Sequence, residues 1–196
     1  MQELALAMTG EEGRRLDSSE LVLLLRRAKA GDVAAFEEIL LRHERLVFRT
    51  AHRLLGSVED AQDASQEVFL RLHQHLRCFD AERAVAPWLY RVTVNVCWDI
   101  AGKRKKDVPL ESVELAAPAE QAADYSREEM KRVVQMALRR LPEKERAALV
   151  LRDIEGLPTG EVARVMGSSE ATVRSQISSA RLKIKRFADS FRGRIR

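Results

Sequence analysis

Apolar side chains recur every three or four residues along most of the chain, which is the spacing of one face of an α-helix. The longest such face lies between Asp32 and Gly56 and contains Phe36, Ile39, Leu40, His43, Leu46, Val47, Thr50 and Leu54. Shorter faces occur in residues 19–31 and 57–76. Asp32 and Ser57 each precede a face and can accept hydrogen bonds from the free N–H groups of a first helical turn. The pattern therefore predicts three consecutive helices.

A fourth helix is predicted from Pro87 to about Gly102, because proline is well placed in a first helical turn. Residues 78–86 lack a continuing apolar face and are expected to form the loop that leads into it. Together the four helices predict a domain over residues 19–106. The preceding residues, 1–18, carry no persistent pattern and are expected to be a mobile tail.

The helical pattern is interrupted over residues 107–125, which contain two prolines, five acidic residues and no Lys or Arg. This segment is expected to be a flexible acidic linker. Helical spacing resumes and continues to the C-terminus, and no segment shows the alternation of a strand. The predicted fold class is all-α, with two small helical domains, 19–106 and 126–196, on a tether.

Residues 155–183 have the pattern of a helix-turn-helix. Gly167 supplies a sharp break, and Ser168 or Ser169 can cap the next helix. Val173, Ile177 and Ala180 would face inward there, which leaves outside the polar side chains Thr172, Arg174, Ser175, Gln176, Ser178, Ser179 and Arg181. Such side chains suit a DNA major groove, where Arg and Gln read base edges and hydroxyls reach phosphates. The alternative is a helical hairpin with a solvated polar face.

The net charge of +4 is modest, but its distribution supports a nucleic-acid partner. Residues 181–196 contain seven Lys or Arg and one acid, so the chain has a basic end and an acidic middle segment. The only cysteines, Cys78 and Cys97, are far apart and belong to no ligand cluster, so no metal or cofactor is expected and both thiols are expected to be buried and free. No signal peptide or membrane span is found, and a soluble cytoplasmic protein without membrane insertion is expected.

Two constellations stand out in the first domain. Asp60, Asp63, Gln66, Glu67 and Leu70 follow one strip of a helix, which is either a solvated face or a docking surface with Leu70 or Phe69 as its apolar anchor. The second constellation combines aromatic, polar and basic side chains that suit unpaired bases and phosphates: Asp80, Arg83, Trp88, Tyr90, Arg91, Asn95, Lys103 and Arg104. Trp88 could equally be a core residue, whereas Tyr90 and Arg91 lie off the apolar face.

These motifs resemble bacterial sigma factors of the extracytoplasmic-function class, within the sigma-70 family. Residues 60–80 and 87–96 look like the second conserved region of that family, and residues 138–185 look like its fourth region. Both occur in the family's order, and the resemblance covers roughly residues 21–186. It implies promoter-specific transcription initiation by core RNA polymerase, without enzymatic activity or cofactor, usually under control of an anti-sigma factor.

The resemblance also implies roles for residues. Asp60, Asp63, Gln66, Glu67, Phe69 and Leu70 would bind the β′ clamp helices of a polymerase whose β subunit is a further partner. The loop of residues 78–86 and the aromatic and basic residues after it would open and hold the −10 element. The recognition helix of residues 172–181, supported by Arg152, would read the −35 element.

The chain departs from the family at several positions. The aromatic residue and the Arg that usually precede Trp88 are replaced by Val85 and Ala86, so melting is expected to be weaker or differently specified. Gln176 and Ser179 stand where the family commonly has Arg, so affinity for the −35 element is expected to be lower or its sequence unusual.

Two other function classes stay open. A stand-alone helix-turn-helix regulator would bind paired half-sites without polymerase. A pure interaction protein would join two partners through its acidic helix and basic end. An enzyme is the weakest alternative, because none of the four histidines is placed with a nucleophile or a metal-ligand cluster.

Overall fold

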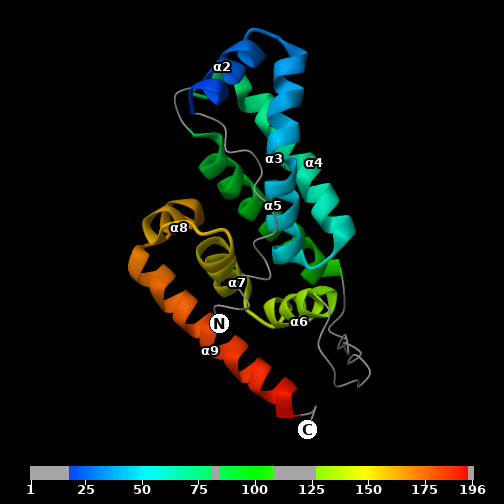
Figure 1. Ribbon diagram of the computed structural model, residues 1–196, viewed down its shortest axis with the longest axis vertical. Coiled ribbons are helices and arrows are strands. Elements are labelled where there is room, and N and C mark those ends of the chain that lie inside the picture. Colours follow the sequence, from blue (N-terminus) through cyan, green and yellow to red (C-terminus); the bar gives the residue numbers. More distant parts are fainter. Residues whose placement is uncertain (1–17, 81–83, 108–126, 194–196) are drawn as a thin grey trace.

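The computed structural model describes residues 18–80, 84–107 and 127–193, and the regular elements in those ranges are all helical (Figure 1). The first group, here called the N-terminal module, consists of α2 (Ser18–Lys29), α3 (Val33–Leu55), α4 (Val58–His75), the 3₁₀ turn η1 (Leu76–Cys78) and α5 (Val85–Asp107). The second, the C-terminal module, consists of α6 (Arg127–Arg139), α7 (Glu143–Leu149), the π-helical turn η2 (Val150–Ile154), α8 (Thr159–Met166) and α9 (Glu170–Gly193). The predicted all-α fold is confirmed.

The predicted ends of α3 and the start of α4 are confirmed in detail. Asp32 accepts a hydrogen bond from the backbone N–H of Ala35 at 3.1 Å, and Ser57 accepts one from the N–H of Asp60 at 3.3 Å. Gly56 ends α3 with a left-handed φ of 74°, which glycine adopts without steric cost. Local capping chemistry therefore defines this helical pair.

The fourth helix is longer than its sequence predicts at both ends. α5 begins at Val85, two residues before Pro87, and runs five residues beyond Gly102 to Asp107. Lys and Arg are good helix formers, so the basic run continues the helix and outweighs the cost of one glycine. Lys103 and Arg104 are therefore helical side chains and not part of a segment that follows the helix.

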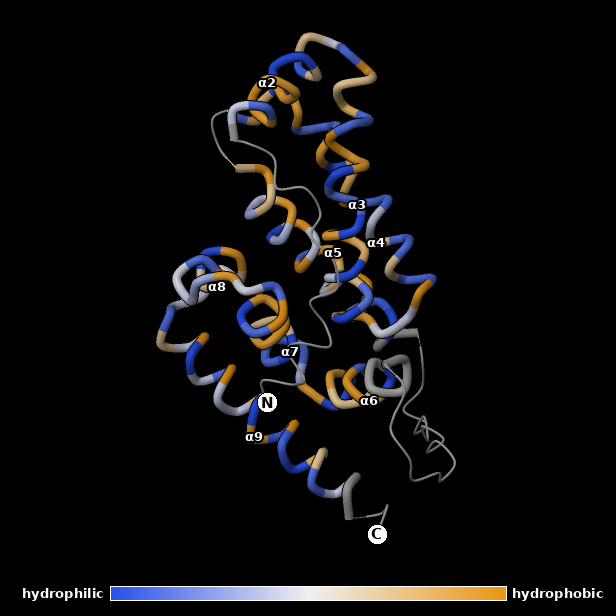
Figure 2. The backbone as a smooth tube through the Cα atoms, in the orientation of Figure 1, coloured by the Kyte–Doolittle hydropathy of each residue, from blue (hydrophilic) through white to orange (hydrophobic). Residues whose placement is uncertain are grey.

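The long helix α3 is the centre of the N-terminal module, with α2, α4 and α5 packed around it. Along each helix, hydrophobic and hydrophilic residues alternate with the helical period (Figure 2). The buried side chains include Leu25, Ile39, Val47, Val68, Leu72, Leu89 and Val94. In the C-terminal module Leu138, Leu151, Val162, Val173 and Ile177 form the corresponding core. Burial of such aliphatic side chains contributes about 1.5–3 kcal/mol each.

The two modules pack against each other. α8 lies against α5, while α6, α7 and η2 lie against the C-terminal half of α3, so that the buried residues of both modules form one continuous cluster. The sequence predicted tethered domains and contained no signal for this contact. The predicted linker, 107–125, and the tail, 1–18, lie almost entirely outside the described residues, so their flexibility stays a prediction.

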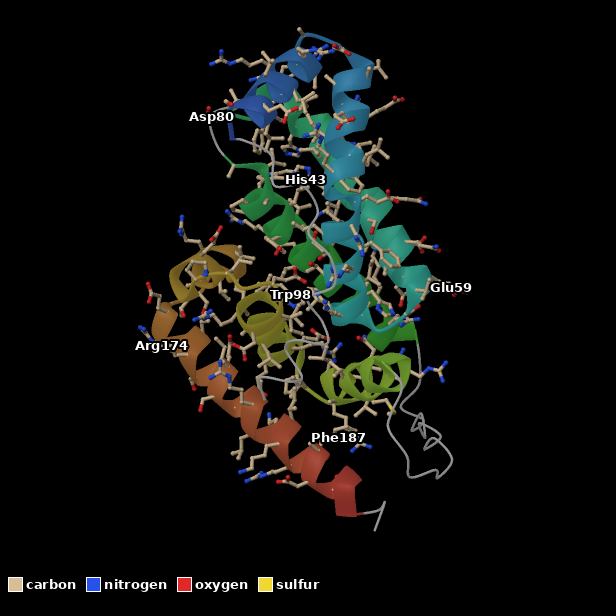
Figure 3. The ribbon with its side chains drawn as sticks, viewed as in Figure 1. His43, Glu59, Asp80, Trp98, Arg174 and Phe187 are labelled. Carbon is tan, nitrogen blue, oxygen red and sulfur yellow. The ribbon has the colours of Figure 1, made fainter. Side chains whose placement is uncertain are left out.

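Acidification should destabilise this fold through His43, which is labelled in Figure 3. The ring is buried and its Nδ1 donates to the Ile39 carbonyl at 2.8 Å; burial lowers the pKa of His43 below its ordinary value of 6.5. The native state therefore resists protonation, and the free energy of unfolding should decrease as the pH falls below about 6.5, where the unfolded chain takes up the proton.

We expect His43→Gln to flatten the dependence of the melting temperature on pH between about 6.5 and 5, as followed by circular dichroism. Burial also lowers the pKa of His52, so part of the slope remains. The matched control is His73→Gln at an exposed position of α4. Identical pH profiles for wild type and His43→Gln would contradict the assignment.

Candidate nucleic-acid interface

The outer face of α9 is built by the turn that precedes it. Gly167 ends α8 in the left-handed region with φ 60°, and Ser169 then caps α9 by accepting from the Thr172 N–H at 3.1 Å. The predicted inward residues Val173, Ile177 and Ala180 are buried. Thr172, Arg174, Ser175, Ser178 and Arg181 are exposed as predicted, and Arg174 extends from the outer side of the helix (Figure 3).

A basic depression of about 290 Å³ lies beside this face, lined by Arg152, Thr159, Arg174, Ile177, Ser178 and Arg181. It places Arg152 of η2 beside α9, and the predicted support of DNA contact by Arg152 stays a prediction. Arg181 donates two hydrogen bonds to Asp153, at 2.8 and 2.6 Å, and this pairing raises the pKa of the guanidinium. Asp153 was missed from sequence because it lies 28 residues away on another element.

Gln176 and Ser179 do not look outward, so that part of the prediction is wrong. Gln176 is half-buried, and within the described part of the chain its Oε1 is buried without a hydrogen-bond partner. Ser179 donates to Glu145 of α7 at 3.1 Å, and Lys183 pairs with the same carboxylate at 2.7 Å. These contacts brace α9 against α7, and the predicted DNA contacts of Gln176 and Ser179 stay untested.

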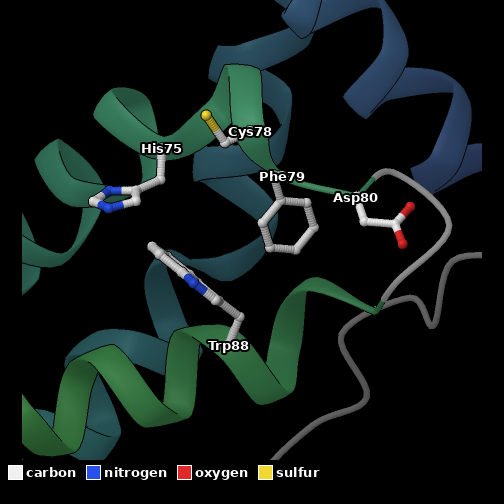
Figure 4. A pocket seen from close by; sticks show the side chains of 5 residues that line it. All are labelled: His75, Cys78, Phe79, Asp80 and Trp88. Carbon is white, nitrogen blue, oxygen red and sulfur yellow. The ribbon is translucent and has the colours of Figure 1, made fainter.

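A second hollow, of about 400 Å³, lies where η1 meets the start of α5 (Figure 4). Its lining is His75, Cys78, Phe79, Asp80 and Trp88. The Phe79 and Trp88 rings meet edge to face with centroids 5.9 Å apart, and the His75 ring lies 6.2 Å from Trp88. The Asp80 carboxylate points away from the rings (Figure 4). Trp88 is half-buried and packs partly against the core, and its contact with DNA stays a prediction.

The remaining residues of the predicted strand-binding set have different surroundings. Arg91, Asn95, Lys103 and Arg104 are exposed along α5, whereas Arg83 lies outside the described residues. Tyr90 is buried, and its hydroxyl donates to Oε2 of Glu155 at 3.1 Å. Burial raises the pKa of Tyr90 well above its ordinary value. The prediction that Tyr90 lies off the packed face is therefore wrong, because the C-terminal module covers it.

Only part of the side-chain strip predicted on α4 is exposed to solvent. Asp63, Gln66 and Leu70 are exposed, and 53% of the Leu70 surface is accessible. Phe69 is half-buried against the core, which leaves Leu70 as the apolar side chain on the surface. The flanking carboxylates carry ion pairs: Asp60 with Arg104 at 2.7 Å, and Glu67 with Arg71 at 2.7 Å.

The two thiols differ in exposure. Both cysteines are free; Cys97 is buried as expected, whereas Cys78 is exposed at the rim of the aromatic hollow, which corrects the prediction for that residue. Burial, with a contribution from Asp60, raises the pKa of the Cys97 thiol to about 12. Among the described residues no group of three or more His, Cys, Asp or Glu could hold a metal ion. None of the described helices is both long and apolar enough to span a membrane.

The two modules correspond to two known family models. Residues 39–107 match the model described as Sigma-70 region 2, and residues 131–184 match Sigma-70, region 4. The chain is 36% identical over 174 residues to the ECF RNA polymerase sigma factor SigM of Mycobacterium tuberculosis, with 89% of this chain and 87% of that protein covered. It is 31% identical over 170 residues to the RNA polymerase sigma-H factor of Pseudomonas aeruginosa, covering 81% and 88%.

Solved structures agree with these matches. The structure of CnrH in complex with the cytosolic domain of CnrY superposes with a TM-score of 0.67 at 26% identity, over 89% of this chain and 99% of that one. The sigma factor RpoE from Bartonella quintana, solved with the anti-sigma factor NepR, superposes with a TM-score of 0.63 at 21% identity, over 79% and 96%. The second likeness supports the fold alone.

Alkylation should distinguish the two thiols. Iodoacetamide reacts with the thiolate, so at about pH 8 we expect one adduct per native chain, at Cys78, and two after denaturation, counted by mass spectrometry. Cys78→Ser should remove the native adduct entirely. Rapid modification of Cys97 in the native protein would contradict the packing described for α5.

Proposed function

Because the chain belongs to the ECF RNA polymerase sigma factors of the sigma-70 family, we propose that it binds core RNA polymerase and directs initiation at specific promoters. The observation that carries this proposal is the pairing of two dissimilar surfaces on one chain. One is the basic depression beside α9, and the other is the aromatic hollow beside α5. A basic surface suits the phosphates and base edges of duplex DNA, and an aromatic surface suits the stacking of unpaired bases.

The basic depression is suited to the −35 element. Arg174, Ser175 and Ser178 are exposed on the first turns of α9, the part of a recognition helix that enters a major groove. Arg152 approaches the same hollow from η2. Arg181 is already paired with Asp153, so its contribution to DNA affinity is smaller than its charge alone suggests.

The aromatic hollow is suited to a base displaced from the −10 element. Its volume of about 400 Å³ lies between aromatic walls on which a base can stack, and stacking contributes about 1–3 kcal/mol per base. Arg91, Asn95 and Lys103 continue along the exposed side of α5 and can follow the phosphates of the displaced strand. Capturing bases in this way offsets the cost of unpairing without any catalytic chemistry.

The exposed part of the α4 strip is suited to core polymerase. Asp63 and Gln66 precede the accessible Leu70 on the same side of α4, and a polar strip that ends in an apolar side chain suits a docking surface for the β′ clamp helices. The β subunit is the expected partner of the C-terminal module. These roles would place the protein in the cytoplasm with its polymerase.

An anti-sigma factor is the further expected partner. CnrH was solved with the cytosolic domain of CnrY, and RpoE of Bartonella quintana with the anti-sigma factor NepR.

The rival function of a stand-alone regulator would give a footprint of the free protein on paired half-sites. An in-vitro transcription assay with purified core polymerase distinguishes these two functions, because a sigma factor initiates transcription only together with core polymerase.

Removal of one guanidinium from α9 should weaken promoter use. We expect Arg174→Ala to reduce promoter-directed transcription by about 10-fold, since one such contact contributes about 1–3 kcal/mol. Promoters are first located by mapping transcript starts after overproduction of the protein. DNA that contains such a promoter is then the template for an in-vitro transcription assay with core polymerase. Arg132→Ala, an equal charge change on exposed α6, is the control. Wild-type transcription by Arg174→Ala would contradict the role of α9.

A charge placed at the apolar end of the α4 strip should weaken polymerase binding. We expect Leu70→Glu to lower the affinity for core polymerase at least about 10-fold, because an apolar anchor contributes 2 kcal/mol or more, measured by fluorescence anisotropy. Glu44→Lys, at an exposed position of α3, serves as the control. Undiminished binding by Leu70→Glu would exclude this strip as the docking surface.

A further inference from the structure

The end of α2 is tied to the loop that carries Phe79. Lys29 is the last residue of α2, and its Nζ donates a hydrogen bond to the Phe79 carbonyl at 2.8 Å, although the two residues are 50 positions apart. α2 also lies against η1, the turn that precedes Phe79. Lys29 thereby holds the backbone at the point where η1 ends and the loop toward α5 begins.

The last turn of α2 is itself held in place. Arg27 donates two hydrogen bonds to Asp32, at 2.9 and 2.6 Å, and Asp32 also caps α3. Ala28, in the same turn, is buried in the core. Lys29 therefore extends from a turn that is fixed to α3, and its hydrogen bond fixes the Phe79 carbonyl to the same framework.

Phe79 is the buried member of the aromatic pair in the hollow. Only 9% of its surface is exposed, whereas Trp88 is half-buried. The two ring planes are nearly perpendicular, at 88°, which is an attractive geometry for aromatic rings. Figure 4 shows Phe79 extending from the loop and Trp88 from α5, with the two rings approaching each other. The position of Phe79 therefore determines where the indole of Trp88 is held.

Stacking of a base requires Trp88 in one defined orientation. A half-buried indole can occupy several rotamers, and every rotamer that does not stack lowers the apparent affinity for the base. Edge-to-face packing on Phe79 favours one of these rotamers. A binding side chain keeps its geometry when hydrogen bonds behind it hold its neighbours, and a donor that carries a charge forms the stronger bond. Lys29 is such a donor at the Phe79 carbonyl.

We propose that Lys29 is a positioning residue for base capture: it fixes the loop at Phe79, and Phe79 in turn orients Trp88 toward the unpaired base. This inference rests on the proposed function of the aromatic hollow. Lys29 acts through the two rings, so its own charge makes no contact with DNA phosphates. α2, to which the sequence assigned no part in DNA binding, thus contributes to the capture of the −10 element.

Fluorescence of Trp88 tests the first step without DNA. The chain has two tryptophans, so Trp98→Phe leaves Trp88 as the single reporter. In this background we expect Lys29→Met to shift the emission of Trp88 to longer wavelength and to increase its quenching by acrylamide, because a released Phe79 leaves the indole more accessible. Lys29→Arg keeps a cationic donor and should retain the wild-type emission and quenching.

Strand binding tests the second step in the full-length chain, with and without core polymerase. The probe is a fluorescein-labelled oligonucleotide with the non-template −10 strand of a promoter located by transcript mapping, and its anisotropy reports binding. We expect Lys29→Met to weaken binding about 5-fold at every salt concentration, since one charge-assisted hydrogen bond is lost. Arg45→Met, an equal charge change at an exposed position of α3, is the matched control and should bind as the wild type does.

Salt dependence separates positioning from phosphate contact. Lys103→Met, at an exposed position of α5, should reduce the slope of log K against log salt by about 0.7, the value for one phosphate of a single strand. Lys29→Met should leave that slope unchanged. A slope reduced as in Lys103→Met would make Lys29 a phosphate contact and overturn the inference. Wild-type quenching or wild-type strand binding in Lys29→Met would also overturn it.

Trp88→Ala separates this inference from the proposed function. Undiminished strand binding by Trp88→Ala, or a chain that binds neither core polymerase nor the oligonucleotide, would overturn base capture in the hollow. The fluorescence of Trp88 would then still decide whether Lys29 positions the ring pair. Weakened binding by Trp88→Ala beside wild-type binding by Lys29→Met would overturn the role of Lys29 and leave base capture intact.

Discussion

The C-terminal end of α3 constrains much of this structure, because its last carbonyl groups have few donors within the helix. The Gly56 N–H reaches the His52 carbonyl, and the other donors come from elsewhere in the chain. The C-terminal module supplies them from Gln135, Arg139 and Arg146. The turn at Gly56 must also stay free of a side chain: its φ is positive, and a Cβ there would collide with Arg139. The N-terminal module is therefore completed electrostatically by residues more than 80 positions later.

Burial of charge shapes the rest of the contact between the modules. Arg53, Arg146 and Glu155 are taken largely out of water, and each is held by a partner across the interface. An apolar interface of similar size would hold the modules more strongly. The polar contacts define one arrangement of the two modules.

Polar contacts of a different kind position α9, the helix proposed to read DNA. Glu145 holds Ser179 and Lys183, and Asp153 holds Arg181, so α9 is braced against α7 and η2 on one side. This bracing leaves Thr172, Arg174, Ser175 and Ser178 exposed in the first half of the helix. Arg181 and Lys183 therefore hold α9 in position, and fewer cationic side chains of α9 are available to phosphates than its composition suggests.

The sequence by itself determined what depends on neighbouring residues. The caps at Asp32 and Ser57, the breaks at Gly56 and Gly167, and the inward faces of α3 and α9 are local or periodic properties, and each was predicted correctly. For the cap of α9 the sequence left Ser168 and Ser169 open, and the structure shows Ser169. Two motifs in series were likewise enough to predict the family, since order and spacing along the chain are properties of sequence.

Tertiary structure decided what depends on pairs of distant residues. Tyr90 was expected to be free because its own helix leaves it off the apolar face, yet a carboxylate 65 positions away covers it. Ser179 likewise donates to a carboxylate 34 positions away, Gln176 is half-buried, and Cys78 is exposed where burial was expected. Helical periodicity describes one helix at a time, so it contains no information on which module will lie against which face.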